Sequence, residues 1–233
     1  MLDILIWNVR GLNDPRKKAA VKEHILANKV SICCLQETKE SFSQNDIRDI
    51  SGGGMLSEFV CKPSIGASGG ILICWNDSIW RMISSVEVYG PCEDSSRHVL
   101  WEELSQVKAV HGLPWCVLGD FNVTRFVEDR NRIAEEGLVD LPIANQNFTW
   151  SNLREVPALA RLDRVLIDAE WEEAFPLCRL SGLPRICSDH SPLLLVGGDV
   201  ARKPVWFRFE NWWLLRLDFK HWWRVRGLRQ QGF

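Results

Sequence analysis

The stretch SDHSPLLL, residues 188–195, places an acidic residue next to a histidine, immediately before an apolar and strand-like run. Asp189 and His190 have two explanations. They belong to a solvated turn that ends at the strand, or the strand holds them rigidly against a substrate. In the second case the carboxylate is a ligand or proton acceptor, and the imidazole can gain or lose a proton near neutral pH. The polar residues elsewhere in the chain decide between these explanations.

Five other strand-like stretches carry polar residues at or near their ends, namely ILIWN (Asn8), CCLQE (Glu37), VEVY (Tyr89), WCVLGDFN (Asp120 and Asn122) and RLDRVL (Asp163). Taken alone, most of these residues have an ordinary explanation, such as a turn at Asn8 or GDFN, or a solvated strand end at Glu37. Asp163 lies inside an apolar run, where a buried carboxylate needs a partner. Six strands that each deliver a polar group indicate a catalytic face.

One subset of these residues predicts a metal site. Glu37 offers a carboxylate oxygen, Asn8 an amide oxygen and Asp189 a second carboxylate. Mg²⁺ prefers such hard oxygen ligands and uses few of them, because it keeps part of its water shell. We therefore expect Mg²⁺ at these residues, with Mn²⁺ as an alternative.

The remaining residues predict phosphodiester chemistry. Asp163 beside the imidazole would hold His190 in one tautomer and raise its pKa. Protonated His190, together with Asn122, would stabilise the charge on a phosphoryl group. Asp120 is then the base that orients and deprotonates water. These assignments together predict a phosphodiesterase.

The elements that must position these residues alternate between strand-like and helix-like patterns. Helices are predicted at 15–28, where a proline starts a helical repeat of apolar residues, and at 97–110. Strands are predicted at 3–9, 30–37, 56–61, 70–75, 83–89, 115–122, 147–151, 161–167 and 191–196. Strands outnumber helices without strict alternation, which favours an α+β or mixed α/β sandwich over a doubly wound parallel sheet.

Composition narrows the protein class. The 233 residues are 46% hydrophobic and 25% charged, as in an ordinary globular protein. The apolar runs are far shorter than the roughly 20 residues of a membrane helix, and the N-terminal run lacks the basic flank of a signal peptide. We therefore expect an intracellular protein that does not enter membranes. The eight cysteines form no C-x-x-C pair, which favours reduced buried thiols over a zinc site.

The formal net charge of −2 conceals a basic tail. Residues 201–233 hold eight Lys or Arg against two acidic residues, which leaves 20 basic and 28 acidic residues in 1–200. An acidic body argues against nucleic-acid binding over its whole surface but suits a carboxylate-lined pocket that holds a metal ion. The tryptophans of the tail either stack on nucleic-acid bases or form the apolar face of a helix, and their spacing favours the helix.

The ordered motifs IWNVRGL, LQETK, VYGP, GDFN, FTWSN, RLDRVL and SDHSP resemble the endonuclease/exonuclease/phosphatase family, which includes DNase I and the apurinic endonucleases. The sequences of these motifs resemble most those of the endonuclease domain of plant LINE-type (non-LTR) retrotransposons. This resemblance implies a four-layered αββα sandwich of the DNase I type and Mg²⁺-dependent nicking of DNA that leaves a 3′-hydroxyl.

The resemblance also implies residue roles. Glu37 would be the principal metal ligand, with Asn8 beside it, and Asp163 would pair with His190. Asp120 would position the nucleophilic water. Asn122, Tyr89 and Trp150 would contact the substrate.

Two departures from the family pattern leave other functions open. The chain is shorter than its relatives near 76–86 and 123–137, so we expect an endonuclease domain at 1–198 that lacks part of a sheet edge and of a substrate-facing wall. Residues 199–233 are expected to be a linker and a truncated helix. No reverse transcriptase follows, so we interpret the chain as a fragment. We expect a monomer that binds DNA, and that is nuclear if functional. The alternatives are an inactive retrotransposon remnant, and an abasic-site endonuclease or phosphatase on the same fold.

Overall fold

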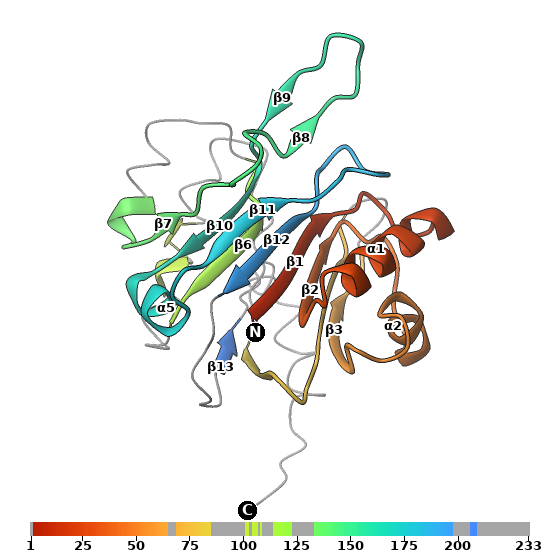
Figure 1. Cartoon of the computed structure of the whole chain (residues 1–233), viewed down its shortest axis with the longest axis horizontal. Coiled ribbons are helices and arrows are strands. Elements are labelled where there is room, and N and C mark those ends of the chain that lie inside the picture. Colours follow the sequence, from red (N-terminus) through yellow and green to blue (C-terminus); the bar gives the residue numbers. More distant parts are fainter. Residues whose placement is uncertain are drawn as a thin grey trace, which may run out of the picture.

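The computed structural model describes residues 2–64, 69–84, 101–102, 104–106, 108, 114–122, 133–197 and 206–208, with the backbone alone for 81–84 and 206–208. Two β-sheets pack face to face in this part of the chain, and helices lie outside them (Figure 1). The predicted mixed α/β sandwich is therefore confirmed. No helix within the described residues is long and apolar enough to cross a bilayer, and their seven cysteines are all free.

The larger sheet has six strands in the order β11-β12-β1-β2-β4-β3. Their bounds are β1 Leu2–Asn8, β2 Ile32–Gln36, β3 Glu58–Lys62, β4 Ile71–Trp75, β11 Arg179–Gly182 and β12 Leu193–Gly197. β1 lies between β12, to which it is antiparallel, and β2, to which it is parallel. β1 is apolar on both faces because both are covered: Ile4 and Ile6 belong to the core between the sheets, and Leu5 and Trp7 to the core under the helices.

The second sheet consists of the antiparallel strands β6 (Cys116–Asp120), β10 (Asp163–Ile167) and β7 (Val139–Asp140), with β10 in the centre. Along β10, Val165 and Ile167 enter the core between the sheets, whereas Leu166 faces outward. There Leu166 packs in one cluster with the helical residues Trp101 and Leu104. The side-chain alternation of a strand thus builds both an inner and an outer core.

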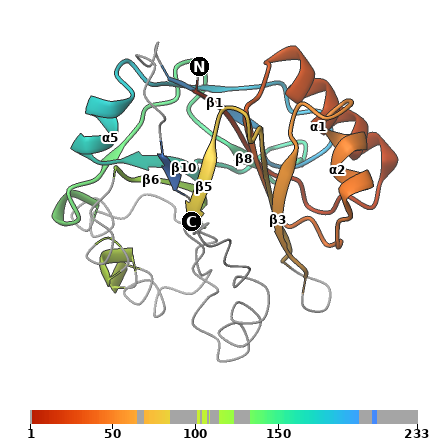
Figure 2. The ribbon, with the colours of Figure 1, turned by 90° about the horizontal axis from the view of Figure 1, so that it is seen from below.

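The defined helices are α1 (Pro15–Ala27), α2 (Gln44–Ile50) and α5 (Ala169–Ala174). Figure 2 shows α1 and α2 together on one side of the molecule and α5 on the opposite side. α1 starts where the sequence predicts, because Asp14 accepts a hydrogen bond from the Arg16 backbone N–H and proline occupies the first helical position. Val21 and Ile25 are buried in the core shared with the larger sheet.

The remaining strands are short. β8 (Trp150–Ser151) and β9 (Leu159–Ala160) form a hairpin that projects beyond the sandwich (Figure 1), and β5 (Arg81–Ser84) pairs with β13 (Trp206–Arg208) in parallel. β5 starts before the strand predicted at 83–89. β13 lies in the stretch predicted as a linker, so backbone pairing with the rest of the protein continues beyond residue 198. The helix predicted further on lies outside the described residues.

The first of the two segments predicted to be shortened is largely described. Residues 76–80 form a turn in which the Ile79 and Trp80 backbone N–H groups donate to the Asn76 carbonyl, and the chain then enters β5. Trp80 is buried in the core between the sheets. β5 joins neither of the two packed sheets, and β3 forms one edge of the larger sheet. Residues 123–132 of the second shortened segment lie outside the described residues.

Candidate active site

Strand ends from both sheets meet at one edge of the sandwich. Asn8 ends β1 and pairs with Gln36, which ends β2, so Glu37 follows next to Asn8. In the second sheet Asp120 ends β6 and pairs with Asp163, which begins β10. A hydrogen bond of 3.1 Å from Asn8 Nδ2 to Asp120 Oδ2 joins the two sheets at this edge. The sheet register thus brings together residues that lie up to 155 positions apart in the chain.

The Asp189–His190 dipeptide is fixed at the same edge. The Ser188 hydroxyl donates to the Asn8 carbonyl at 2.8 Å and accepts from the His190 backbone N–H at 3.2 Å. The indole N–H of Trp7 donates to the His190 carbonyl at 3.0 Å. All three bonds are buried, and they hold the dipeptide against the end of β1, just before β12 begins.

The imidazole of His190 lies between two buried carboxylates. Its Nδ1 is 2.9 Å from Asp163 Oδ2, and its Nε2 is 3.8 Å from Asp120 Oδ2. All three residues are at most 3% exposed. The predicted pairing of Asp163 with His190 is therefore present in the geometry, and Asp120 lies on the opposite edge of the ring.

These contacts set the charge of each group. Burial opposes protonation of His190, but the adjacent Asp163 carboxylate, with Asp120 and Asp189, outweighs burial and raises the His190 pKa to about 9. Burial, together with the charge of Asp163, raises the Asp120 pKa to about 6. At neutral pH the site therefore contains an imidazolium at His190 and an ionised carboxylate at Asp120.

Asn8 connects Glu37 to this group. It is fully buried, and its amide Nδ2 donates to Glu37 Oε1 at 3.0 Å as well as to Asp120. Its Oδ1 accepts from the Arg10 backbone N–H at 3.2 Å. In this arrangement the Asn8 amide orients the two carboxylates, and its predicted role as a metal ligand stays a prediction.

Asp189 has contacts that differ from those of His190. Its Oδ2 accepts a hydrogen bond of 2.9 Å from the indole N–H of Trp150 and forms an ion pair with the Arg10 guanidinium. Arg10 Nε also lies 3.7 Å from Glu37 Oε2. Arg10 thus bridges two of the residues predicted to bind metal.

The backbone around the site adopts conformations that non-glycine residues rarely populate. φ is 52° at Glu37, 51° at Asn122 and 48° at Arg10. Such conformations cost on the order of 1–3 kcal/mol each and persist where the surroundings impose them. One such constraint is visible at GDFN, where the Asn122 backbone N–H donates to Asp120 Oδ1 at 2.9 Å and the Asp120 backbone N–H donates to Gln36 Oε1 at 2.8 Å.

Four residues of the site were not predicted: Arg10, Gln36, Thr149 and Ser188. The Thr149 hydroxyl is fully buried and accepts from the backbone N–H groups of Leu162 and Asp163, both at 3.0 Å, so it holds the start of β10. Each of the four lies inside or beside a motif that the sequence analysis had singled out. Their roles depend on contacts between distant segments, and only the motif membership was a usable signal.

The predicted substrate-contacting residues are described in part. Trp150 lies on β8, which is held against the dipeptide by a bond of 3.0 Å from the Ser151 backbone N–H to the Asp189 carbonyl. Asn122 follows β6 and is half-buried. Tyr89 lies outside the described residues, so its position in the site stays a prediction.

Two groups of residues at this edge offer ligands to a metal ion. The acceptor atoms of Asp120, Asp163 and His190 lie within 4.8 Å of one another. His190 suits this role poorly, because a protonated imidazole bonded to Asp163 offers no lone pair. Glu37, at 8% exposure, and Asp189, which shares Arg10 with it, have oxygen atoms of the kind that a hard cation prefers, and their role as metal ligands stays a prediction.

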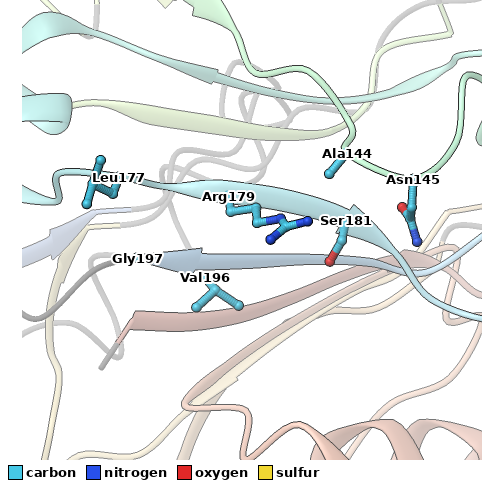
Figure 3. A pocket seen from close by; sticks show the side chains of 7 residues that line it. All are labelled: Ala144, Asn145, Leu177, Arg179, Ser181, Val196 and Gly197. Atoms are coloured by element: carbon cyan, nitrogen blue, oxygen red, sulfur yellow. The ribbon is translucent and has the colours of Figure 1, made fainter.

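A separate open depression of about 480 Å³ lies on β11 and β12 (Figure 3). Arg179, Ser181 and Val196 are among the side chains that line it. None of the residues at the strand-end site lines the depression, so the candidate chemistry does not take place there.

Comparison with known proteins agrees with this geometry. The family model described as Endonuclease/Exonuclease/phosphatase family matches residues 5–190. The chain belongs to this family. The match includes every described residue of the site, from Asn8 to His190. Members of the family hydrolyse phosphate esters or diesters and are typically dependent on a divalent metal ion. No curated protein matches the chain.

Solved structures share the fold at low sequence identity. An AP endonuclease from Archaeoglobus fulgidus is 19% identical over 84% of this chain and 99% of that chain, with a TM-score of 0.65. The endonuclease domain of TRAS1, a telomere-specific non-LTR retrotransposon, is 13% identical over 84% and 97%, with a TM-score of 0.63. The 3′ phosphatase NExo from Neisseria is 16% identical over 85% and 100%, with a TM-score of 0.60. At these identities the similarity establishes the fold alone.

Proposed function

We propose that the protein is a Mg²⁺-dependent endonuclease that nicks DNA and leaves a 3′-hydroxyl, and that it derives from a LINE-type retrotransposon. The observation that carries this proposal is the buried series of contacts from Asp163 through His190 to Asp120, next to Glu37. The sequences of the motifs and the structural similarity to the TRAS1 endonuclease domain support the retrotransposon origin.

His190 supplies positive charge to the substrate. With its Nδ1–H donated to Asp163, the imidazolium keeps its Nε2–H for a phosphate oxygen. Asp163 fixes the ring orientation and stabilises the charged form. The His190 pKa of about 9 keeps this donor protonated through neutral pH.

Asp120 is the group that accepts a proton from the attacking water. Its pKa of about 6 leaves it ionised at pH 7 and above, and close enough to neutrality to serve as a general base. The hydrogen bond from Asn8 and the contact with His190 hold its Oδ2 in place. Asn122, Tyr89 and Trp150 are proposed to hold the substrate at this carboxylate.

The metal site is proposed at Glu37, with Asn8 and Asp189 as further ligands and Mn²⁺ as an alternative ion. An ion bound there supplies a Lewis acid that stabilises negative charge on the scissile phosphate. Asn8 contributes by orienting the Glu37 carboxylate from a fully buried position. The functional enzyme would act on DNA in the nucleus.

A panel of three substrates tests the proposal in Mg²⁺, in Mn²⁺ and in EDTA. We expect supercoiled plasmid to be nicked with either ion and to stay intact in EDTA, and a DNA polymerase to extend the nicks from their 3′ ends. Preferred cleavage of a duplex with an abasic site would favour an abasic-site endonuclease. Preferred release of phosphate from a 3′-phosphorylated oligonucleotide would favour a phosphatase. A folded protein that cleaves none of them would be the inactive remnant.

A further inference from the structure

Arg10 lies between the two carboxylates proposed to bind the metal. Its guanidinium forms an ion pair with Asp189 Oδ2, and its Nε lies 3.7 Å from Glu37 Oε2. The side chains of Glu37 and Asp189 are only 9% and 11% exposed, respectively. Two shielded carboxylates at one strand edge therefore share a positive charge that belongs to the protein itself.

We propose that Arg10 is a resident counter-ion of the Glu37–Asp189 pair, and that a divalent cation competes with it for these carboxylates. This inference rests on the metal site of the proposed function and adds a residue that limits metal affinity. A guanidinium and a divalent cation next to the same carboxylates repel each other, because like charges at close range disfavour joint occupancy.

The geometry allows the guanidinium to leave without moving the backbone. The Arg10 side chain is 49% exposed, so it can turn into water without burying its charge. Its backbone is held by a residue outside the proposed metal site, because the Lys17 Nζ donates at 2.8 Å to the carbonyls of both Val9 and Arg10. Metal binding would thus exchange one ion pair for another inside a fixed loop.

Arg10→Gln removes the charge and keeps a polar side chain at this exposed position. Without this unit charge, the repulsion that opposes an incoming cation at close range is removed, so we expect the Kd for Mn²⁺ to fall at least about fivefold. Arg10→Lys retains the charge and should leave the Kd within about threefold of the wild-type value. Arg48→Gln on α2 is the control, because it makes the same charge change at an exposed position on another element.

The test is isothermal titration calorimetry of the purified, DNA-free chain with Mn²⁺, with circular dichroism to verify folding. A tighter Kd in Arg10→Gln, but not in Arg10→Lys or Arg48→Gln, supports the proposal. Equal Kd values in wild type and Arg10→Gln, with binding lost in Glu37→Gln, would overturn the role of Arg10 and leave the metal site standing. An absence of Mn²⁺ binding in every folded variant would overturn both.

Discussion

Replacing Asp163 with asparagine isolates the charge that the site places on His190. The asparagine retains the shape and an oxygen that can accept the Nδ1–H bond, now 2.9 Å long, but it lacks the negative charge. The His190 pKa stands at about 9, against an ordinary value of 6.5. Because each pKa unit corresponds to about 1.4 kcal/mol, the site favours the imidazolium by roughly 3 kcal/mol.

The Asp163→Asn protein should therefore lose the imidazolium at neutral pH. Asp163 is the largest contribution that raises this pKa, and burial opposes it. We expect the His190 pKa to fall to about 6.5 or below, and nicking at pH 7.5 to drop at least about tenfold, because no more than about a tenth of the imidazole is then protonated. The loss should be smaller at pH 5.5 to 6, where protonation returns.

NMR titration of the imidazole signals measures this pKa, and a His190→Ala sample assigns the signal among the five histidines. Asp49→Asn, which removes an exposed carboxylate on α2, is the matched control and should leave both quantities unchanged. A His190 signal that still titrates above pH 8 in Asp163→Asn would refute the electrostatic account of the site.

Three further predictions concern stability and catalysis. In EDTA, the free energy of unfolding should decrease by about 3 kcal/mol as pH rises through about 9, because the pKa of His190 is higher in the folded protein than in the unfolded chain. The contribution of the protonated His190 to stability is complete below about pH 6.5. Urea unfolding at pH 6.5 and 9.5 measures this decrease, and an equally large decrease in His190→Gln would contradict the prediction. Asp120→Asn removes the proposed base and should reduce nicking at least about 10²-fold in protein whose folding is verified by circular dichroism. A variant that retains a tenth of the activity would contradict the assignment. Thr149→Val leaves the Leu162 and Asp163 N–H groups without their acceptor, so thermal or urea unfolding should show a loss of about 1–3 kcal/mol, and an unchanged stability would argue against this contact.

The sequence predicts the sandwich well because burial dictates its pattern. A strand covered on both faces, such as β1 or β12, must be a short apolar run, and the residue that follows or ends it is free to be polar. For this reason the sequence alone identifies Asn8, Glu37 and Asp120 as candidate site residues. The order of the motifs indicates the family, and the fold of that family brings these strand ends together.

Contacts that depend on register and side-chain direction could not be predicted. The pairing of Asp120 opposite Asp163 follows from how β6 and β10 align, and no local pattern encodes that alignment. Arg10 is a surface-type residue in a turn, and its position between two carboxylates depends on β2 and on the loop before β12. The pairing of β13 with β5 is likewise a contact between segments more than 100 residues apart.

The most direct test of the proposed chemistry is the nicking rate of supercoiled plasmid in Mg²⁺ for the wild-type chain and for His190→Ala, with folding verified for both. We predict that the wild-type chain converts plasmid to nicked circles with extendable 3′-hydroxyl ends, that EDTA stops the conversion, and that the alanine variant is slower by at least about 10²-fold. Nicking at the wild-type rate by His190→Ala would contradict the proposal that the Asp163–His190–Asp120 group performs the reaction.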